Sequence, residues 1–526
     1  MTATTATRRW RSDLPDVEIG GTTLPALVLE RAARLGDKPA LVDATSGRTL
    51  SYRQLVEGVE RVAAGLAARG FTKGDVLALY SPNLPEYALA AYGAMAAGGT
   101  VTGANPLLTT EELAGQLADA EARLLVTVPP FLDRALAAAD KAGVQEVLVF
   151  GEADGATPFR ELLTHASPRA QIAIDPDRDP AALPYSSGTT GLPKGVELTH
   201  TQLVTNLRQA QAVLGVREDD VVLAVAPFFH AMGFNILLAC SLAAGATTVT
   251  MLRFELEGFL QAIQEHRATF TIVVPPILLG LANHPLVESY DLSSLRVLGV
   301  GAAPLGAEPE QRCAERLGCM TVQGYGMTET TALVATGPLH APRRGSVGRL
   351  VPNTEARIVD PDSGADLGPG RTGELWVRGP QIMRGYRDRP EATAQTVDTD
   401  GWLHTGDLCY LDEDGYLFVV DRLKELIKFK GYQVAPAELE HLLLTHPAVA
   451  DAAVVPRPDP EAGEVPVAHV ALRGQATAEE LLAYVAERVA PYKKLRAVRF
   501  TDQVPRSPAG KLLRRKLVEA ERAGTR

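Results

Sequence analysis

Residues 50–70 repeat apolar side chains at the spacing of one face of a helix. Ser51, with Gln54 three residues later, has the pattern of a helix N-cap, and Gly70 has that of a helix stop. An apolar run at 76–82 follows directly and reads as a buried strand. The apolar residues that share the helix face are Leu55, Val59, Val62 and Leu66.

The same succession of an amphipathic stretch and an apolar stretch recurs along the chain. It appears at 199–216 followed by 219–229, and at 256–270 followed by 271–276. Repeated helix–strand units with apolar strands are typical of parallel sheets that are covered by helices on both faces. The pattern therefore predicts an α/β fold whose large N-terminal domain contains two helix-covered, mostly parallel sheets.

The pattern changes after about Gly337. Short alternating segments at 355–360, 373–379 and 415–421 are separated by Gly and Pro turns. Short strands between such turns indicate a small β-rich subdomain attached to the large domain.

Beyond Asp421 the chain reads as a smaller α+β unit with helical patterns at 436–447 and 478–490. We therefore expect an N-terminal domain of residues 1–421 and a C-terminal domain of residues 422–526. No Pro/Gly/Ser linker separates them, which favours a tight hinge over a floppy tether.

Length and charge narrow the class of protein. A chain of 526 residues is too long for one hydrophobic core. Its net charge of −11 argues against general affinity for nucleic acid or for an anionic membrane. With 46% hydrophobic residues it has the composition of an ordinary globular protein, which we expect to be a monomer or a homodimer.

Residues 221–252 contain no Asp, Glu, Lys or Arg. A membrane span needs about 20 apolar residues, but polar, Gly and Pro positions interrupt this run, so we expect buried strands flanking a helix and no stable membrane insertion. These positions are Pro227, His230, Gly233, Asn235 and Gly245.

The ends of the chain and its cysteines indicate a cytoplasmic location. Arginines at the N-terminus are not followed by an apolar region, which argues against a secretory signal and leaves a transit peptide as an alternative. The four cysteines form no Cys-x-x-Cys pair and have no His at metal-ligand spacing, so they read as reduced thiols.

The segment SSGTTGLPKG, residues 186–195, has the composition of a phosphate-binding loop. Glycines allow backbone N–H groups to approach an anion, hydroxyls donate further hydrogen bonds, and Lys194 adds a full charge. The Walker pattern does not fit, because Pro193 precedes the lysine and Gly195 follows it. The candidate phosphate-binding residues are Ser186, Ser187, Gly188, Thr189, Thr190, Gly191 and Lys194.

Four segments in order resemble the adenylate-forming superfamily, which comprises acyl-CoA synthetases, nonribosomal adenylation domains and luciferases. They are YSSGTTGLPKG, GYGMTE (324–329), TGD (405–407) and DRLKELIKFKGYQVAPAELE (421–440). The resemblance spans nearly the whole chain, and PFFH, GAAPL and KGYQVAPAELE are most similar to the 4-coumarate–CoA ligase branch.

The resemblance implies ATP, Mg²⁺ and coenzyme A as cofactors and a carboxylic acid as substrate. Thr328 would contact the α-phosphate, Glu329 would bind the metal, and Asp407 and Arg422 would hold the ribose. The implied catalytic residues are Lys511, His230, Thr328, Glu329 and Lys428. The implied nucleotide-binding residues beyond the loop are Gly301, Gln323, Gly324, Tyr325, Thr328, Asp407, Arg422, Lys424, Lys428, Gln433 and Lys511.

The two half-reactions must use the same site one after the other, because Lys511 and the pantetheine arm of CoA cannot occupy the same tunnel mouth together. The family solves this by rotating a mobile C-terminal domain, and the hinge maps to Lys424. Rotation would withdraw Lys511 and bring Lys430 and Gly431 to CoA, with Lys428 and Gln433 on the adenylate. Arg253 would contact a CoA phosphate.

The implied acyl pocket departs from that of hydroxycinnamate ligases. Those enzymes typically have Tyr at the position of Met232 and Ser at that of Ile236, and the usual Pro-Val pair is altered at Leu333. An apolar pocket predicts a cinnamate-like arylacrylic acid, since a buried substrate hydroxyl without a partner costs about 1–3 kcal/mol. The pocket residues are His230, Met232, Ile236, Gly301, Ala302, Gly324, Ala332 and Leu333.

Other interpretations stay open at this point. A medium-chain fatty acid would also suit an apolar pocket, and a stand-alone adenylation enzyme would load a carrier protein instead of CoA. A luciferase shares the scaffold, but the chain ends in ERAGTR and not in Ser-Lys-Leu. His230, a lone histidine in apolar surroundings, can also be read as a structural residue.

Overall fold

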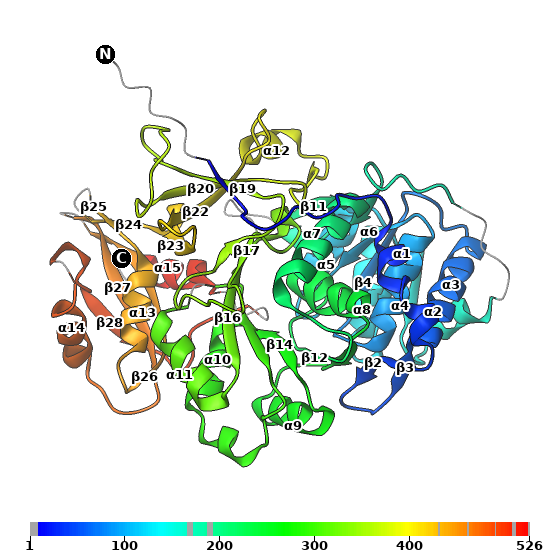
Figure 1. Ribbon diagram of the computed structural model, residues 1–526, viewed down its shortest axis with the longest axis horizontal. Helices are drawn as coiled ribbons and strands as arrows, with labels where there is room; N and C mark the ends of the chain where they lie inside the picture. The colour runs from blue at the N-terminus through cyan, green and yellow to red at the C-terminus, as the bar shows by residue number, and fades with distance from the viewer. Residues whose placement is uncertain are drawn as a thin grey trace.

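The computed structural model describes residues 9–165, 172–186, 193–303, 305–429, 432–459, 462–489, 491–507 and 512–523. Four sheets and the helices between them form the molecule (Figure 1). Three sheets lie in the N-terminal part, and the fourth lies at the left of the view with the C-terminal helices. The expected α/β fold class is confirmed.

The first nine-stranded sheet has a parallel centre, in the order β9-β5-β4-β6-β7-β8. Side chains along β4 alternate between two cores: Ala78 packs with helices α5 and α6, whereas Leu77 packs with α3 and α4. The strands and helices of this layer are β4 (Val76–Tyr80), β5 (Thr100–Gly103), β6 (Ala122–Thr127), β7 (Glu146–Val149), β8 (Thr157–Pro158), β9 (Pro180–Ala182), β10 (Tyr185–Ser186), β11 (Lys194–Thr199), β21 (Gly385–Tyr386), α3 (Tyr52–Ala68), α4 (Pro85–Ala96), α5 (Thr110–Asp119) and α6 (Leu132–Ala142).

The second nine-stranded sheet is parallel from β2 through β13, β12, β14 and β15 to β16. Helices α9–α11 cover one face, and the other face packs on the core shared with the first sheet. The elements are β2 (Pro39–Asp43), β3 (Thr49–Ser51), β12 (Val221–Ala224), β13 (Thr247–Thr250), β14 (Phe270–Val273), β15 (Val297–Val300), β16 (Met320–Tyr325), β17 (Ala335–Thr336), β18 (Arg349–Leu350), α1 (Leu24–Leu29), α2 (Ala32–Leu35), α7 (His200–Leu214), α8 (Ser241–Ala244), α9 (Leu256–His266), α10 (Pro275–Asn283) and α11 (Ala307–Leu317).

The expected β-rich subdomain is a five-stranded antiparallel sheet in the order β1-β19-β20-β22-β23. Its outer strand β1 comes from the N-terminus, where Trp10 pairs with Ala356, a pairing that no sequence pattern predicted. The elements are β1 (Trp10–Arg11), β19 (Glu355–Val359), β20 (Gly373–Arg378), β22 (Leu403–Leu411), β23 (Leu417–Arg422) and α12 (Pro390–Thr396).

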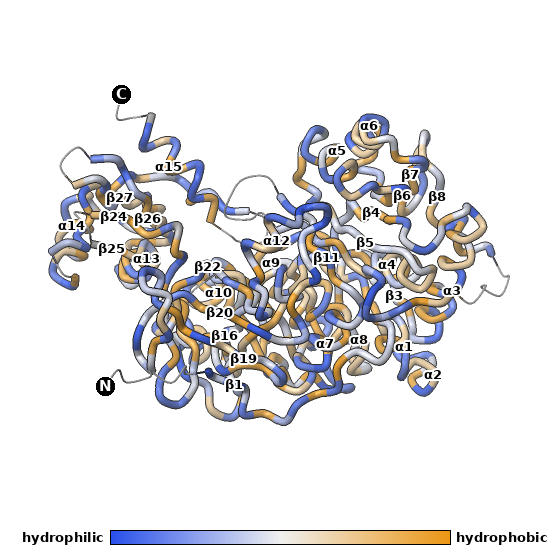
Figure 2. Tube along the Cα trace, turned by 90° about the horizontal axis from the view of Figure 1, so that it is seen from above, coloured by the Kyte–Doolittle hydropathy of each residue, from blue (hydrophilic) through white to orange (hydrophobic). Residues whose placement is uncertain are grey.

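The C-terminal sheet has the order β25-β24-β27-β26, with β28 beside β27. Seen from above, it lies with α13–α15 at one end of the molecule, opposite to α5 and α6 (Figure 2). The elements are β24 (Ile427–Phe429), β25 (Tyr432–Val434), β26 (Val449–Asp459), β27 (Gly463–Leu472), β28 (Ala497–Phe500), α13 (Pro436–Leu444), α14 (Ala478–Ala486) and α15 (Arg514–Ala523).

Two local predictions are confirmed. Ser51 caps α3, since its hydroxyl accepts from Gln54 N–H while the Gln54 side chain accepts from Ser51 N–H. The charge-free run at 221–252 forms β12, a π-helix, α8 and β13 in succession. Throughout the described part of the chain, no helix combines the length and the apolar character that a membrane crossing requires.

His200, the first residue of α7, should make the protein sensitive to acid. It is buried, its Nδ1 accepts from Leu24 N–H at 3.1 Å, and burial lowers its pKa from 6.5 to about 4. Between those pH values the unfolded chain binds the proton more readily, so stability falls as pH falls, by about 3 kcal/mol in total. His200→Asn keeps an acceptor for Leu24 and removes the titration.

We expect the melting temperature of His200→Asn to fall less than that of the wild type between pH 6.5 and pH 4. Thermal unfolding of both proteins across this range, with the difference taken at each pH, isolates the contribution of this one group. An equal fall of the melting temperature with falling pH in the two proteins would contradict the prediction.

Candidate active site

A cavity of about 1090 Å³ opens between the two large sheets and the β-rich subdomain. Its walls come from the carboxyl ends of β12, β14, β15 and β16, from the π-helix Met232–Cys240, and from β11, β21 and β22. Ligands of open parallel sheets bind at the carboxyl ends of the strands, so this is the expected place for a site. The cavity lining includes fifteen of the predicted site residues: Ser186, Lys194, His230, Met232, Ile236, Arg253, Gly301, Ala302, Gly324, Tyr325, Thr328, Glu329, Ala332, Leu333 and Arg422.

The loop predicted to bind phosphate connects two strands, as the sequence indicated. β10 and β11 are antiparallel, and Ser186 pairs with Lys194 across the ladder, so the two ends of the loop meet. Residues 187–192, which include the predicted Ser187, Gly188, Thr189, Thr190 and Gly191, lie outside the described residues.

A polar cluster lies beside the cavity: Tyr325 and Arg422 line it, and the buried Asp407 connects them. The Tyr325 hydroxyl donates to Asp407 Oδ2 at 2.6 Å, and Arg422 Nε donates to Asp407 Oδ1 at 3.2 Å. Asp407 and Arg422 face each other across the β22–β23 ladder. Burial raises the pKa of Asp407, and the Arg422 charge and the hydrogen bonds from Tyr325 and Arg422 oppose that rise. Paired carboxylate oxygens beside an aromatic ring can bind the two hydroxyls of a ribose.

Glu329 also lines the cavity and contacts a residue that the sequence interpretation missed. Its Oε1 accepts from the Tyr386 hydroxyl at 2.8 Å, and the Lys194 ammonium lies 4.8 Å from the centre of the Tyr386 ring. The ladder pairs Tyr386 on β21 with Val196 on β11 and so fixes its position. Tyr386 therefore joins the lysine of the loop to the predicted metal-binding carboxylate.

The remaining wall of the cavity is apolar. Met232 and Ile236 project from the π-helix, a wide helix of the kind that often occurs at functional sites. Gly233 permits the helix to approach its preceding turn, because a Cβ at that position would lie 2.0 Å from the Pro227 carbonyl oxygen. Gly301 leaves room for Met232, whose sulfur would lie 3.1 Å from a Cβ there.

The backbone is strained at one point of this wall. Ala302 has a φ of 72°, in the left-handed region that side chains other than Gly rarely adopt. Strain of this kind gathers at ligand sites, which supports the inclusion of Ala302 among the substrate contacts.

Comparison with known proteins identifies the family. The chain matches the AMP-binding enzymes over residues 28–387 and their C-terminal domain over residues 438–511. It belongs to the AMP-binding enzyme family. A 4-coumarate–CoA ligase from Pinus taeda is 43% identical over 531 residues, which cover 97% of this chain and 97% of the ligase.

Solved structures agree with this assignment. An anthranilate CoA ligase in complex with anthranoyl-AMP has a TM-score of 0.90 at 26% identity and covers 97% of this chain and 99% of its own. ATP-bound MatB from Rhodopseudomonas palustris has a TM-score of 0.86 at 29% identity, covering 96% and 100%. The predicted class, an AMP-forming acid–CoA ligase, is confirmed.

Two predicted site residues of this AMP-binding enzyme lie away from the cavity. Gln323 is buried, and its side-chain amide donates to Glu310 Oε2 at 2.8 Å and to the Leu305 carbonyl at 3.1 Å, on the far side of β16. Lys428 is exposed on β24. Neither side chain can contact a ligand in the cavity in this arrangement of the chain.

The predicted residues of the C-terminal part are incompletely described. Lys424 lies in a turn between β23 and β24, and Gln433 pairs with Lys428 across the β24–β25 ladder. Lys430, Gly431 and Lys511 lie outside the described residues.

Proposed function

We propose that the protein joins an apolar arylacrylic acid of the cinnamate type to coenzyme A, through an acyl-AMP intermediate. The observation that supports this most is that one cavity is lined both by polar side chains, among them Lys194 and Glu329, and by apolar side chains, among them Met232 and Ile236. Such a cavity suits a nucleoside triphosphate and an apolar acid bound together.

The first half-reaction must bring two anions together. A carboxylate oxygen attacks the α-phosphorus of ATP, an acyl–phosphate bond forms, and pyrophosphate leaves. Lys194 and the N–H groups at the ends of its loop offset the repulsion, Thr328 donates to the α-phosphate, and Asp407 with Arg422 holds the ribose. A site preorganised in this way needs little reorganisation in the transition state.

Glu329 fits a magnesium ion that is bound mainly by phosphates. Mg²⁺ in such sites takes one or two carboxylates and completes its shell with phosphate oxygens and waters. Glu329 supplies one buried carboxylate on the cavity wall, and the described residues contain no cluster of three or more candidate ligands. When bound, the ion would neutralise charge on the phosphates.

For the second half-reaction we propose that residues 422–526 turn about Lys424. The CoA thiol then attacks the acyl carbonyl, the thioester forms, and AMP leaves. Arg253, 80% exposed at the cavity edge, is suited to a CoA phosphate. His230 lines the cavity beside the apolar wall, where it can orient the acyl carbonyl.

We propose that the reaction takes place in the cytoplasm. Four buried free cysteines suit the reducing cytoplasm. For the oligomeric state we propose a monomer or a homodimer.

The decisive experiment incubates the protein with ATP, CoA and a panel of acids that contains cinnamate, 4-coumarate and octanoate. We expect release of AMP, not ADP, with the highest kcat/KM for cinnamate. If octanoate has the highest kcat/KM, the result favours a medium-chain fatty acyl-CoA synthetase. Transfer to a carrier protein but not to CoA would favour a stand-alone adenylation enzyme, and no acid-dependent AMP or pyrophosphate exchange would refute the proposal.

The missing hydroxyl partner gives a specificity prediction. In Met232→Tyr combined with Ile236→Ser, we expect the ratio of kcat/KM for 4-coumarate over cinnamate to rise about 10- to 100-fold, because the buried substrate hydroxyl gains partners. Steady-state kinetics with both acids measures the ratio. Met232→Phe with Ile236→Ser is the matched control, which alters shape without the phenol; an equal change in this control would contradict the prediction.

A further inference from the structure

The residues on either side of Lys511 and the three residues before it contact each other. Arg506 and Leu512 form an antiparallel bridge, and Leu513 N–H donates to the Pro505 carbonyl at 2.9 Å. Arg506 and Leu512, which directly follows Lys511 in the chain, therefore lie side by side. Both contacts belong to described residues on either side of the segment.

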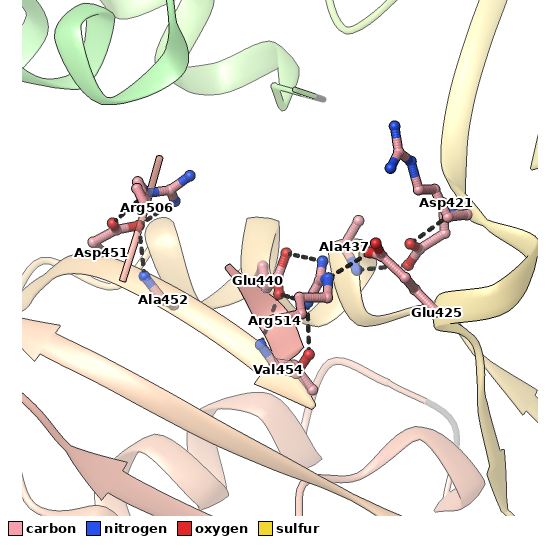
Figure 3. Close-up of polar contacts among 10 residues, drawn as sticks. Asp421, Glu425, Ala437, Glu440, Asp451, Ala452, Val454, Arg506 and Arg514 are labelled. Atoms are coloured by element: carbon pink, nitrogen blue, oxygen red, sulfur yellow. Dashed lines mark hydrogen bonds and ion pairs between the residues drawn. The ribbon is translucent and has the colours of Figure 1, made fainter. Parts of the chain in front are cut away.

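Arg506 fastens the outgoing end of this segment to the sheet. Its Nε donates to Asp451 Oδ2 at 2.9 Å and its Nη2 donates to Asp451 Oδ1 at 2.8 Å, which is a bidentate pair. Asp451 Oδ1 also accepts from Ala452 N–H on strand β26 at 2.9 Å (Figure 3). Paired guanidinium–carboxylate contacts fix direction as well as distance. The Arg506 and Asp451 side chains are 20% and 21% exposed.

Arg514 fastens the returning end. At the start of α15 it contacts Glu425 and Glu440, donating to Glu440 Oε2 at 3.0 Å and to the Val454 carbonyl at 2.7 Å. Figure 3 shows the guanidinium between the two carboxylates. Glu425 is the residue after Lys424, so this contact joins the start of α15 to the segment that follows the proposed hinge.

The Arg514 cluster is largely buried. The side chain of Arg514 is 15% exposed and that of Glu440 is 13% exposed. Nearby Asp421, whose carboxylate accepts from Ala437 N–H, is also buried. Separating the partners of such a buried pair is costly, because it leaves an uncompensated charge out of water.

We propose that Arg506 and Arg514 are positioning residues for Lys511: they hold both ends of the segment that presents this lysine, and they tie it to the hinge. The proposal rests on the role of Lys511 in the proposed function. A misplacement of a catalytic group by about 1 Å can lower the rate about 100-fold, so the contacts of Arg506 and Arg514, which we call the clamp, would affect the rate through the position of Lys511. The clamp serves adenylation alone, since Lys511 is withdrawn during thioester formation.

The neighbouring Arg515 provides a matched control. Its side chain is 84% exposed and pairs with Glu519 one turn later on α15. It has the same charge as Arg514 and a position one residue away, but it holds no part of the clamp. Arg515→Met is therefore expected to leave both half-reactions within about twofold of the wild type.

The test separates the half-reactions in the full-length protein. We expect Arg506→Met and Arg514→Met to lower kcat for acid-dependent pyrophosphate exchange about 10- to 100-fold, with the KM for ATP and the rate of transfer from preformed acyl-AMP to CoA within about threefold. Asp451→Asn should act like Arg506→Met, and the double variant should be no worse than either single one. Arg506→Lys and Arg514→Lys keep the charge and provide a second pair of variants should a Met variant fail to fold. Their exchange rates should lie between those of the wild type and of the Met variants.

Loss of both half-reactions in proportion would overturn the proposal, because it would show a general structural role. Full exchange activity in the Lys and Met variants, or additive effects at Arg506 and Asp451, would overturn it as well. Failure of the proposed function is distinguishable from these results, since the wild type itself would then show no exchange with any acid.

Discussion

Replacing Lys511 with alanine is expected to lower acid-dependent pyrophosphate exchange by about 100-fold or more, because the transition state loses a full charge at the oxygens that bridge acid and α-phosphate. Transfer of the acyl group from preformed acyl-AMP to CoA is expected to stay within about threefold of the wild type, since the lysine is withdrawn when the thiol enters. Radiolabelled pyrophosphate exchange and direct thioester formation measure the two steps separately.

A reciprocal variant serves as the control for Lys511→Ala. In Gly431→Leu a side chain should obstruct the approach of the thiol, so transfer should fail while exchange persists. Two variants with opposite effects on two steps exclude a common loss of folding. Equal loss of both steps in Lys511→Ala would argue against alternation of the C-terminal domain.

The sequence predicted those parts of the fold that depend on periodicity. The face of α3 and the apolar run of β4 follow from spacing along one segment, and both formed as expected. Strand β1 could not be predicted this way, because Trp10 and its partner Ala356 are far apart in the chain and a strand of two residues has no periodicity. Its position depends on the sheet that is already formed by β19 and β20.

The site followed the same rule. Contiguous motifs placed Lys194, Tyr325 and Glu329 on the cavity wall, because each motif carries its own backbone geometry. Tyr386 was missed because it meets Glu329 only through the β11–β21 pairing. The position of Gln323 could have been questioned: its neighbours Val322 and Gly324 on β16 line the cavity, so alternation directs the side chain between them to the other face.

A substitution that keeps the size of Glu329 but removes its charge tests whether the charge binds the metal. Glu329→Gln keeps an oxygen for the Tyr386 hydroxyl but loses the negative charge, so we expect pyrophosphate exchange to fall about 100-fold and the Mg²⁺ concentration for half-maximal exchange to rise about 10-fold. Titration of exchange with Mg²⁺ at saturating ATP and acid measures both values. Tyr386→Phe is the milder comparison, because it keeps the Glu329 charge and removes one hydrogen bond to it, which is worth about 1.5–3 kcal/mol at most. We therefore expect this variant to change the exchange rate and the Mg²⁺ requirement in the same direction, but less. A larger effect in Tyr386→Phe than in Glu329→Gln, or a Mg²⁺ dependence in Glu329→Gln equal to that of the wild type, would show that Glu329 holds the tyrosine and not the metal.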